Sequence, residues 1–462
     1  MLKFIREWLW KFMLKRLKHV VRETNYGGQI IVLNTGAIIG PEEDAMLQAL
    51  HSRSVGGLLG HLKVLAKTGA KKFMASFYIG YGHKSIGDCG TATIFIEGVS
   101  MLAAKAIQHW PLYSGQEAST RYIDFAKQKF IDVFGYQSTT RILERWRAAY
   151  LKYLPIMVEH FKKRFPFQDG WDSNDYKKAI NARAFDVVRG LLPAGASTNL
   201  AWHTNLRQAA DHIEWLRHHP LDEVRDIAEK MEQALKEAFP SSFSSKRYEA
   251  TEGYHASWMR QHCYSTADFH PDFDYSTECV DWEMVESLLP TMSRRPPKTE
   301  LPREVAFCGT VRFQFLLDFG SFRDIQRQRA VTQLMPLLTS DFGFEQWYID
   351  EMPREIRDEV LELIQSQREE LEELNLAPEY AQYFHPMGYR IPNALIGDLH
   401  ALVYLVELRN TRFVHPTLRR RARQMAEALA IEFGHYGLTV DLDKNPDAFD
   451  VKRGKHDIVL KK

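Results

Sequence analysis

The chain has 462 residues, which exceeds the usual size of a single domain and predicts two or more packed units. Its 60 Lys and Arg residues nearly balance 59 Asp and Glu residues. The resulting net charge of +1 argues against a general nucleic-acid binder that neutralises phosphates over a broad surface. Four dispersed cysteines without a Cys-x-x-Cys pair argue against a zinc ribbon or a disulfide framework, and they fit a reducing, cytoplasmic setting.

Residues 1–25 predict a basic amphipathic helix, because lysines and arginines are interspersed with aromatic and aliphatic residues such as Trp8 and Trp10. A helix of this kind lies on an anionic membrane surface or packs on a partner subunit, and the sequence leaves both open. The segment is too charged for a transmembrane span. It also lacks the uninterrupted apolar core of a signal peptide, so a membrane partner is not expected.

The rest of the chain alternates between strand and helix patterns. Residues 29–39 are rich in Ile and Val and predict a strand or hairpin. Helical patterns cover five later segments, residues 42–68, 93–109, 138–164, 204–217 and 221–235. From Ser241 to about Pro302 the sequence becomes rich in Ser, Tyr, His, Asp and Pro, which indicates a long connector that wraps a surface or covers a site.

The second half of the chain repeats the plan of the first. An apolar segment ends in Asp318-Phe319-Gly320-Ser321, which echoes Glu97-Gly98-Val99-Ser100. Leu408-Arg409 in turn echoes Leu216-Arg217. The sequence therefore predicts an ancient duplication, with a first repeat over residues 26–245, a linker over 246–302 and a divergent second repeat over 303–462.

Residues 113–122, Tyr-Ser-Gly-Gln-Glu-Ala-Ser-Thr-Arg-Tyr, concentrate polar chemistry at the end of an apolar segment. Arginine offers a forked cation to a phosphate, serine and glutamine offer neutral donors, and glutamate accepts from a sugar hydroxyl or a base edge. The set therefore suits a nucleotide. The alternative is purely structural, with Gly115 in a turn and Ser119 or Thr120 capping a helix that begins near Arg121.

Three segments in this order resemble the flavin-dependent thymidylate synthases: Gly80-Tyr81-Gly82-His83-Lys84-Ser85, then Glu97-Gly98-Val99-Ser100, then Glu117-x-Ser119-x-Arg121-Tyr122. The resemblance implies a helix-rich α+β fold, with long helices and a small antiparallel sheet in each repeat. It implies bound FAD, and conversion of deoxyuridylate (dUMP) to thymidylate (dTMP) with methylenetetrahydrofolate and NADPH as co-substrates. Since family members are homotetramers with active sites between subunits, a homodimer forming a pseudo-tetramer is expected here.

The resemblance also assigns site residues. The substrate-binding set is Glu117, Ser119, Arg121, Arg189 and Arg217, of which Ser119 and Arg217 are also the catalytic candidates. In the first repeat the cofactor-binding set is His83, Arg207 and His212. Two structural alternatives stay open. His212 could be a structural histidine beside Asp211, and Arg217 could be an arginine at a helix C-terminus, where the helix dipole favours a positive charge. No metal site is expected, because His218 and His219 lack carboxylates or cysteines at ligand spacing.

The two repeats depart from the family pattern in opposite ways. An Arg-His-Arg triplet of the family grips the flavin phosphates, and it falls on His109-Trp110-Pro111 in the first repeat. The second repeat instead reads Arg327-Gln328-Arg329, which adds three residues to the cofactor-binding set, but it lacks the later serine and arginine. We therefore expect one active site shared between the repeats. The alternative for these arginines and Arg323 is a solvated helix face paired with Asp324.

Two other functions fit the same sequence. The apparatus could hydroxymethylate dUMP or modify another pyrimidine. The chain could also be a catalytically inactive, duplicated scaffold that binds a nucleotide, which is favoured by His109-Trp110-Pro111, by Gln328 at the position of the central histidine, and by Gly87-Asp88-Cys89 where the family often has a Glu-His pair.

Overall fold

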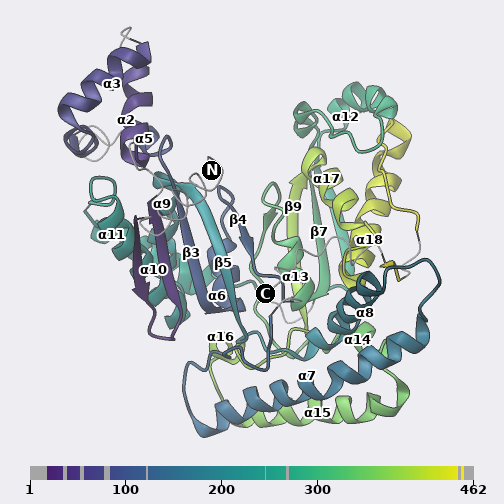
Figure 1. Ribbon diagram of the computed structural model, residues 1–462. Coiled ribbons are helices and arrows are strands. Elements are labelled where there is room, and N and C mark those ends of the chain that lie inside the picture. Colours follow the sequence, from purple (N-terminus) through teal and green to yellow (C-terminus); the bar gives the residue numbers. More distant parts are fainter. Residues whose placement is uncertain are drawn as a thin grey trace, which may run out of the picture. The chain divides into compact units, whose positions relative to one another are not determined.

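The chain divides into two compact units that interleave along the sequence (Figure 1). Unit 1 comprises residues 1–118 and 197–263, and unit 2 comprises residues 119–196 and 264–462. The computed structural model describes residues 18–34, 39–52, 57–76, 84–120, 123–244, 246–266, 270–445 and 449–451. Residues 119–196 belong to the predicted first repeat but pack in unit 2. The repeat boundaries concern ancestry rather than packing, and they stay a prediction.

Unit 1 is built on a five-stranded antiparallel sheet in the order β1-β2-β3-β5-β4. The strands are β1 (Lys18–Glu23), β2 (Gln29–Asn34), β3 (Thr91–Ser100), β4 (Ser114–Glu117) and β5 (Ser197–Asn205). Helices α6 (Met101–Gln108), α9 (Leu206–Leu216) and α10 (Asp222–Ala238) pack on this sheet. Their apolar faces and the strands bury the core, which includes Ile94, Ile96, Trp202, Ile213 and Ile227.

A small helical group completes the first part of unit 1. It contains α2 (Pro41–His51), α3 (Gly57–Thr68), α4 (Lys71–Phe73) and α5 (Lys84–Gly87), which Figure 1 shows in purple. Ala45, Met46, Met74 and Ile86 form its buried core. The helix predicted over residues 42–68 is thus two helices.

Two segments predicted as helix are strands. Residues 18–23, the end of the predicted amino-terminal helix, form β1, and the remainder of that prediction lies outside the described residues. Residues 93–100 belong to β3, and the helix α6 begins only at Met101. Both segments carry β-branched residues that fit a pleated sheet, and in β3 the side chains of Ala92, Ile94 and Ile96 alternate toward the core.

Unit 2 contains a four-stranded antiparallel sheet in the order β6-β7-β9-β8. Its strands are β6 (Phe273–Val280), β7 (Gly309–Asp318), β8 (Thr332–Gln333) and β9 (Arg390–Asp398). Helices α13 (Phe319–Ile325), α17 (Leu399–Arg409) and α18 (Pro416–Phe433) pack on it. The segment predicted as a linker is therefore structured, because it contains α11 (Glu249–His262), strand β6 and α12 (Trp282–Leu288).

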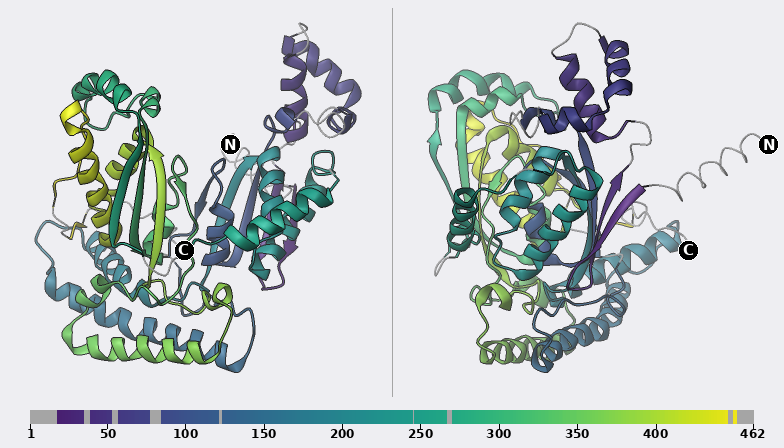
Figure 2. Two further views of the ribbon diagram at one scale, coloured as in Figure 1. Left: turned by 180° about the vertical axis from the view of Figure 1, so that it is seen from behind. Right: turned by 90° about the vertical axis from the view of Figure 1, so that its left-hand side faces the viewer.

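Long helices form the second layer of unit 2. They are α7 (Gln137–Arg164), α8 (Ser173–Val188) and α15 (Arg354–Glu373), with the shorter α14 (Gln346–Asp350) and α16 (Pro378–Ala381) and the 3-10 helix η3 (Arg189–Leu191). Figures 1 and 2 show α7 and α15 side by side. Arg145 of α7 donates to Glu370 of α15 over 2.6 Å, and Gln367 donates to the carbonyl of Ile142 over 2.9 Å.

The strand-to-helix junctions repeat between the two sheets. Ser100 ends β3 and caps α6 by accepting from the amide of Ala103, and Asp318 ends β7 and caps α13 in the same way. Asn205 and Asp398 do the same after β5 and β9. Each cap accepts from the amide three residues later, as helix N-caps do. These equivalent positions support the predicted duplication.

The sheets, the long helices and the strand order agree with the predicted α+β class. Within the part of the chain that the structure describes, no helix combines the length and apolarity that crossing a membrane requires.

Candidate functional site

The polar decapeptide begins as an edge strand. Residues 114–117 form β4, which pairs with β5 so that Glu117 lies opposite Leu200. The amide of Ala118 continues the ladder with a 2.7 Å bond to the carbonyl of Asn199. Ser119 follows as a half-buried residue at the point where the chain passes into unit 2. Arg121 lies outside the described residues, as does His83.

Glu117 is held by a lysine of the neighbouring helix. The Nζ atom of Lys105 on α6 lies 2.7 Å from Glu117 Oε2, and both side chains are almost fully buried. Lys105 also donates to Gln108. The protein itself therefore satisfies the charge of this predicted substrate residue. The sequence contained a signal for the pair, because Lys105 is the lone charge in an otherwise apolar helix and needs a counter-charge when buried.

His212 is packed as a neutral histidine within unit 1. Its Nε2 atom lies 2.9 Å from the carbonyl oxygen of Ile107, and its ring stacks on Trp110 with 4.5 Å between centroids. Burial lowers the pKa of His212 to about 3. Trp110 in turn donates from Nε1 to Gln208 over 2.9 Å. The resemblance places Trp110 at the central position of the flavin triplet, and here its indole contacts His212 and Gln208 of α9.

The two predicted arginines of α9 are paired with acids of unit 1. Arg207, in the first turn, places Nε 2.8 Å from Asp88 Oδ1 and lies 3.7 Å from Asp211. Arg217, just after the last turn, donates to Glu252 over 2.6 Å and to Glu232 over 3.4 Å. Arg217 also lines a polar cavity of about 540 Å³.

Arg189 belongs to unit 2 and is buried in η3. One of its terminal nitrogens donates to Ser321 Oγ over 3.1 Å. Its Nε atom is buried and has no hydrogen-bond partner among the described residues. The guanidinium of Arg189 also interacts with the buried hydroxyl of Tyr348, so the protein itself engages much of this group.

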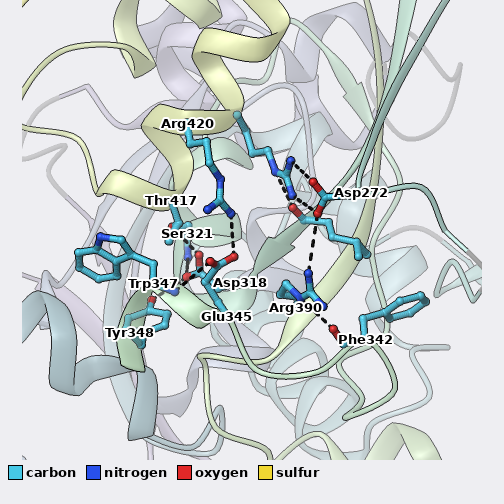
Figure 3. Close-up of polar contacts among 12 residues, drawn as sticks. Asp272, Asp318, Ser321, Phe342, Glu345, Trp347, Tyr348, Arg390, Thr417 and Arg420 are labelled. Atoms are coloured by element: carbon cyan, nitrogen blue, oxygen red, sulfur yellow. Dashed lines mark hydrogen bonds and ion pairs between the residues drawn. The ribbon is translucent and has the colours of Figure 1, made fainter. Parts of the chain in front are cut away.

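Ser321, which accepts from Arg189, belongs to a buried hydrogen-bond network around Asp318, and Figure 3 shows Asp318, Ser321, Tyr348 and Thr417 of this network. Asp318 accepts from the amide of Ser321 over 2.9 Å, from the hydroxyl of Tyr348 over 2.7 Å and from Thr417 Oγ1 over 2.5 Å. His415 extends the network with a 2.8 Å contact to Thr417. Burial raises the pKa of Asp318 despite the opposing effect of Arg189. The network joins β7, α14 and α18 around η3 and fixes the position of Arg189.

Four arginines of unit 2 act on one carboxylate, that of Asp324 at the end of α13. Burial alone would raise the pKa of Asp324, but the positive charges of Arg327, Arg189, Arg409 and Arg323 outweigh it and hold that pKa below its ordinary value. Arg327 is the nearest, with 3.6 Å between its terminal nitrogen and Asp324 Oδ1. We refer to these four arginines as the arginine cluster.

The arginine cluster also faces other acids, because Asp318 and Asp186 act on Arg189 alongside Asp324. Arg327 keeps about 41% of its side chain exposed, so its charge is accessible to a ligand. The Nε atom of Arg409 is buried without a hydrogen-bond partner among the described residues, as is that of Arg189. Forked guanidinium groups with unused donors bind phosphate groups well. The donor set therefore fits the phosphates of a nucleotide cofactor.

The other predicted residues of the second repeat lie close in sequence to this cluster. Gln328 is buried, and its carbonyl accepts from Gln333 over 3.3 Å. Arg329 is exposed. The sequence marks Arg409 as the echo of Arg217, and the local pattern does not indicate that the charge of Arg409 acts on Asp324. Among the described residues, no three His, Cys, Asp or Glu side chains gather in an arrangement that could hold a metal ion.

Comparisons with known proteins support the resemblance. Residues 43–241 match the family model described as "Thymidylate synthase complementing protein". The chain is 26% identical to a UPF0159 protein of Chlamydia muridarum over 411 residues, covering 75% of this chain and 76% of that protein. It is 26% identical to a UPF0159 protein of Chlamydia pneumoniae over 402 residues, covering 73% and 74%.

A UPF0159 protein of Thermoplasma acidophilum is 23% identical over 430 residues, covering 77% of this chain and 85% of that protein. These alignments extend well beyond the segment that the family model matches, so the relatives share more than that segment with this chain. Residues 43–241 are therefore similar to the thymidylate synthase complementing protein family.

Proposed function

We propose that this chain is a flavin-dependent enzyme that converts dUMP to dTMP, with methylenetetrahydrofolate and NADPH as co-substrates. The observation that carries the proposal is the ion pair between Arg327 and Asp324 in unit 2, where the charge of Arg189 also helps to lower the pKa of Asp324. Arg189 comes from the predicted first repeat and was assigned to the substrate. Arg327 comes from the second repeat and was assigned to the flavin. Their common carboxylate supports one site to which both repeats contribute.

In this proposal the arginine cluster binds the phosphates of the flavin nucleotide. Arg327 offers an accessible guanidinium, and Arg189 and Arg409 offer buried donors that lack partners within the described residues. Bound FAD would supply the hydride-transfer chemistry, and the protein would supply orientation and electrostatic stabilisation. Before the phosphate binds, the negative charge of Asp324 reduces the electrostatic repulsion between the arginines. The bound phosphate would then take over part of this charge compensation.

The first repeat lacks arginines at the positions of the flavin-binding triplet, which supports assigning flavin binding to the second repeat. Its triplet positions hold His109-Trp110-Pro111, and Trp110 is engaged with His212 and Gln208. Neither an indole nor a proline offers a guanidinium, so this part of unit 1 does not fit a flavin phosphate. We therefore assign flavin binding to the second repeat and keep the first repeat as the source of nucleotide-binding residues.

The proposal is tested with the purified protein, dUMP, methylenetetrahydrofolate and NADPH. We expect a yellow protein with flavin bound and the accumulation of dTMP in product analysis. The appearance of hydroxymethyl-dUMP instead would retain the flavoenzyme and change its product. Absence of bound flavin from protein that was purified and also supplied with excess FAD would refute the proposal.

A nucleotide-binding scaffold without catalysis is the second candidate. The observation that favours it is the engagement of first-repeat residues with the protein itself, since Glu117 pairs with Lys105 and Arg217 pairs with two glutamates. Such a scaffold would bind dUMP without consuming NADPH. Binding measured by calorimetry together with NADPH oxidation measured by absorbance separates the two functions.

A further inference from the structure

Helix α11 places the carboxylate of Glu252 at the C-terminal end of α9. The family resemblance assigns Arg217, at the same end of α9, to the substrate. The carboxylate of Glu252 uses both of its oxygens: Oε1 accepts from Arg217 over 2.6 Å, and Oε2 lies 2.8 Å from His218 Nε2. Burial would raise the pKa of Glu252, but its bonds to Arg217 and His218 prevail and lower that pKa. The group is therefore a carboxylate at neutral pH.

This carboxylate lies where an external anion would find its donors. Arg217, His218, Arg225 and Arg247 line the same cavity of about 540 Å³ as Glu252, together with the acids Asp222, Asp226 and Glu229, within unit 1. The Nε atom of Arg217 is buried and has no hydrogen-bond partner in the described part of the chain. A phosphate has more acceptor oxygens than a carboxylate and could use this nitrogen as well.

Helix α11 buries little of its side-chain surface. Its whole length is described, and His255 is its one buried side chain. That ring lies 4.0 Å from the ring of Trp215 on α9, which is the closest aromatic contact given for α11. Tyr254 and Trp258 on the same helix are more than 45% exposed. A helix with so little buried surface opens at low free-energy cost.

We propose that α11 is a displaceable strap, and that a phosphate group competes with Glu252 for Arg217 and His218. Binding of the phosphate releases the helix from the end of α9, and loss of the phosphate lets Glu252 return. The identification of that phosphate with the one on the pyrimidine nucleotide rests on the proposed function. The competition itself depends on the geometry of unit 1 alone.

The experiment follows hydrogen exchange of α11 amides in the full chain while inorganic phosphate is added. Phosphate is expected to accelerate exchange within residues 249–262 at least tenfold at saturation. In Glu252→Gln, these amides are expected to exchange fast without phosphate, and phosphate is expected to bind at least tenfold more tightly than to the wild type. Glu249→Gln, which alters an exposed residue of the same helix, should behave as the wild type does.

A double variant tests whether the gain in phosphate affinity depends on Arg217. Adding Arg217→Gln to Glu252→Gln should abolish the gain in phosphate affinity. Unchanged α11 exchange on phosphate addition, or equal phosphate affinity of Glu252→Gln and wild type, would overturn the strap. The outcome is separable from that of the proposed function, because phosphate-driven release of α11 in a protein that never converts dUMP supports the strap and contradicts the enzyme.

Discussion

The ammonium of Lys105 lies 2.7 Å from the carboxylate of Glu117, and both side chains are almost completely withdrawn from solvent. Removing one partner of a buried ion pair leaves an uncompensated charge, which typically costs about 3–5 kcal/mol. We therefore expect Glu117→Ala to lower the free energy of unfolding by about that amount. Urea denaturation of the purified variants measures it.

The double variant Lys105→Met/Glu117→Leu is the matched control for this pair. It removes both charges and keeps apolar volume, so most of the lost stability should return. A Glu117→Ala variant as stable as the wild type would mean that the pair contributes nothing to the fold and would free Glu117 for a ligand.

The N-cap Asp318 should contribute more to stability than Asp398, the other N-cap aspartate that follows a strand of the same sheet. Asp318→Ala removes a helix cap and leaves the buried hydroxyls of Tyr348 and Thr417 without their acceptor, for a combined cost of about 3 kcal/mol or more. Asp398 is half-buried and accepts from the amide of Ala401, so Asp398→Ala should cost about 1 kcal/mol. Chemical denaturation of both variants compares the two caps, and equal losses would contradict a special role for the Asp318 network.

The buried histidine of α9 predicts a pH dependence of stability. Burial lowers the pKa of His212 from 6.5 to about 3 in the folded state. Between these values the unfolded chain binds a proton that the folded chain does not, so His212 makes the fold less stable as pH falls below about 6.5. The slope is about 1.4 kcal/mol per pH unit.

The variant His212→Phe keeps an aromatic ring against Trp110 and removes the titrating group. Its loss of stability between pH 6.5 and 4.5 should be smaller than that of the wild type by about 2–3 kcal/mol. Urea midpoints at the two pH values provide the comparison. Identical losses would assign the acid sensitivity to other groups.

Local sequence patterns predicted many of the helices and strands, but not how the chain divides into two compact units. The helix over residues 138–164 was predicted nearly to its ends, since its buried residues Ile142, Trp146 and Tyr150 recur at helical spacing. β3 was mistaken for helix because its apolar run continues without a turn into α6. The placement of residues 119–196 in unit 2 depends on packing between distant elements, which local periodicity does not encode.

The candidate site was predictable to a similar extent. The repeat register identified Arg327, and the family resemblance identified Arg189, each from its own sequence neighbourhood. The sequence alone could not reveal that the charges of both act on Asp324, because that depends on the tertiary packing of η3 and α13, where Arg189 donates to Ser321. The engagement of Arg217 by Glu252 was equally hidden, since α11 lay in a segment predicted as a connector.

The most direct test of the arginine cluster as a flavin-phosphate site is a titration with FAD, followed by flavin fluorescence. Arg327→Gln removes the accessible guanidinium and should weaken FAD binding at least tenfold, which corresponds to about 1.4 kcal/mol. Arg368→Gln, on the exposed face of α15 where Arg368 pairs with Glu372, is the control and should bind FAD as the wild type does. FAD binding by Arg327→Gln with wild-type affinity would contradict the account.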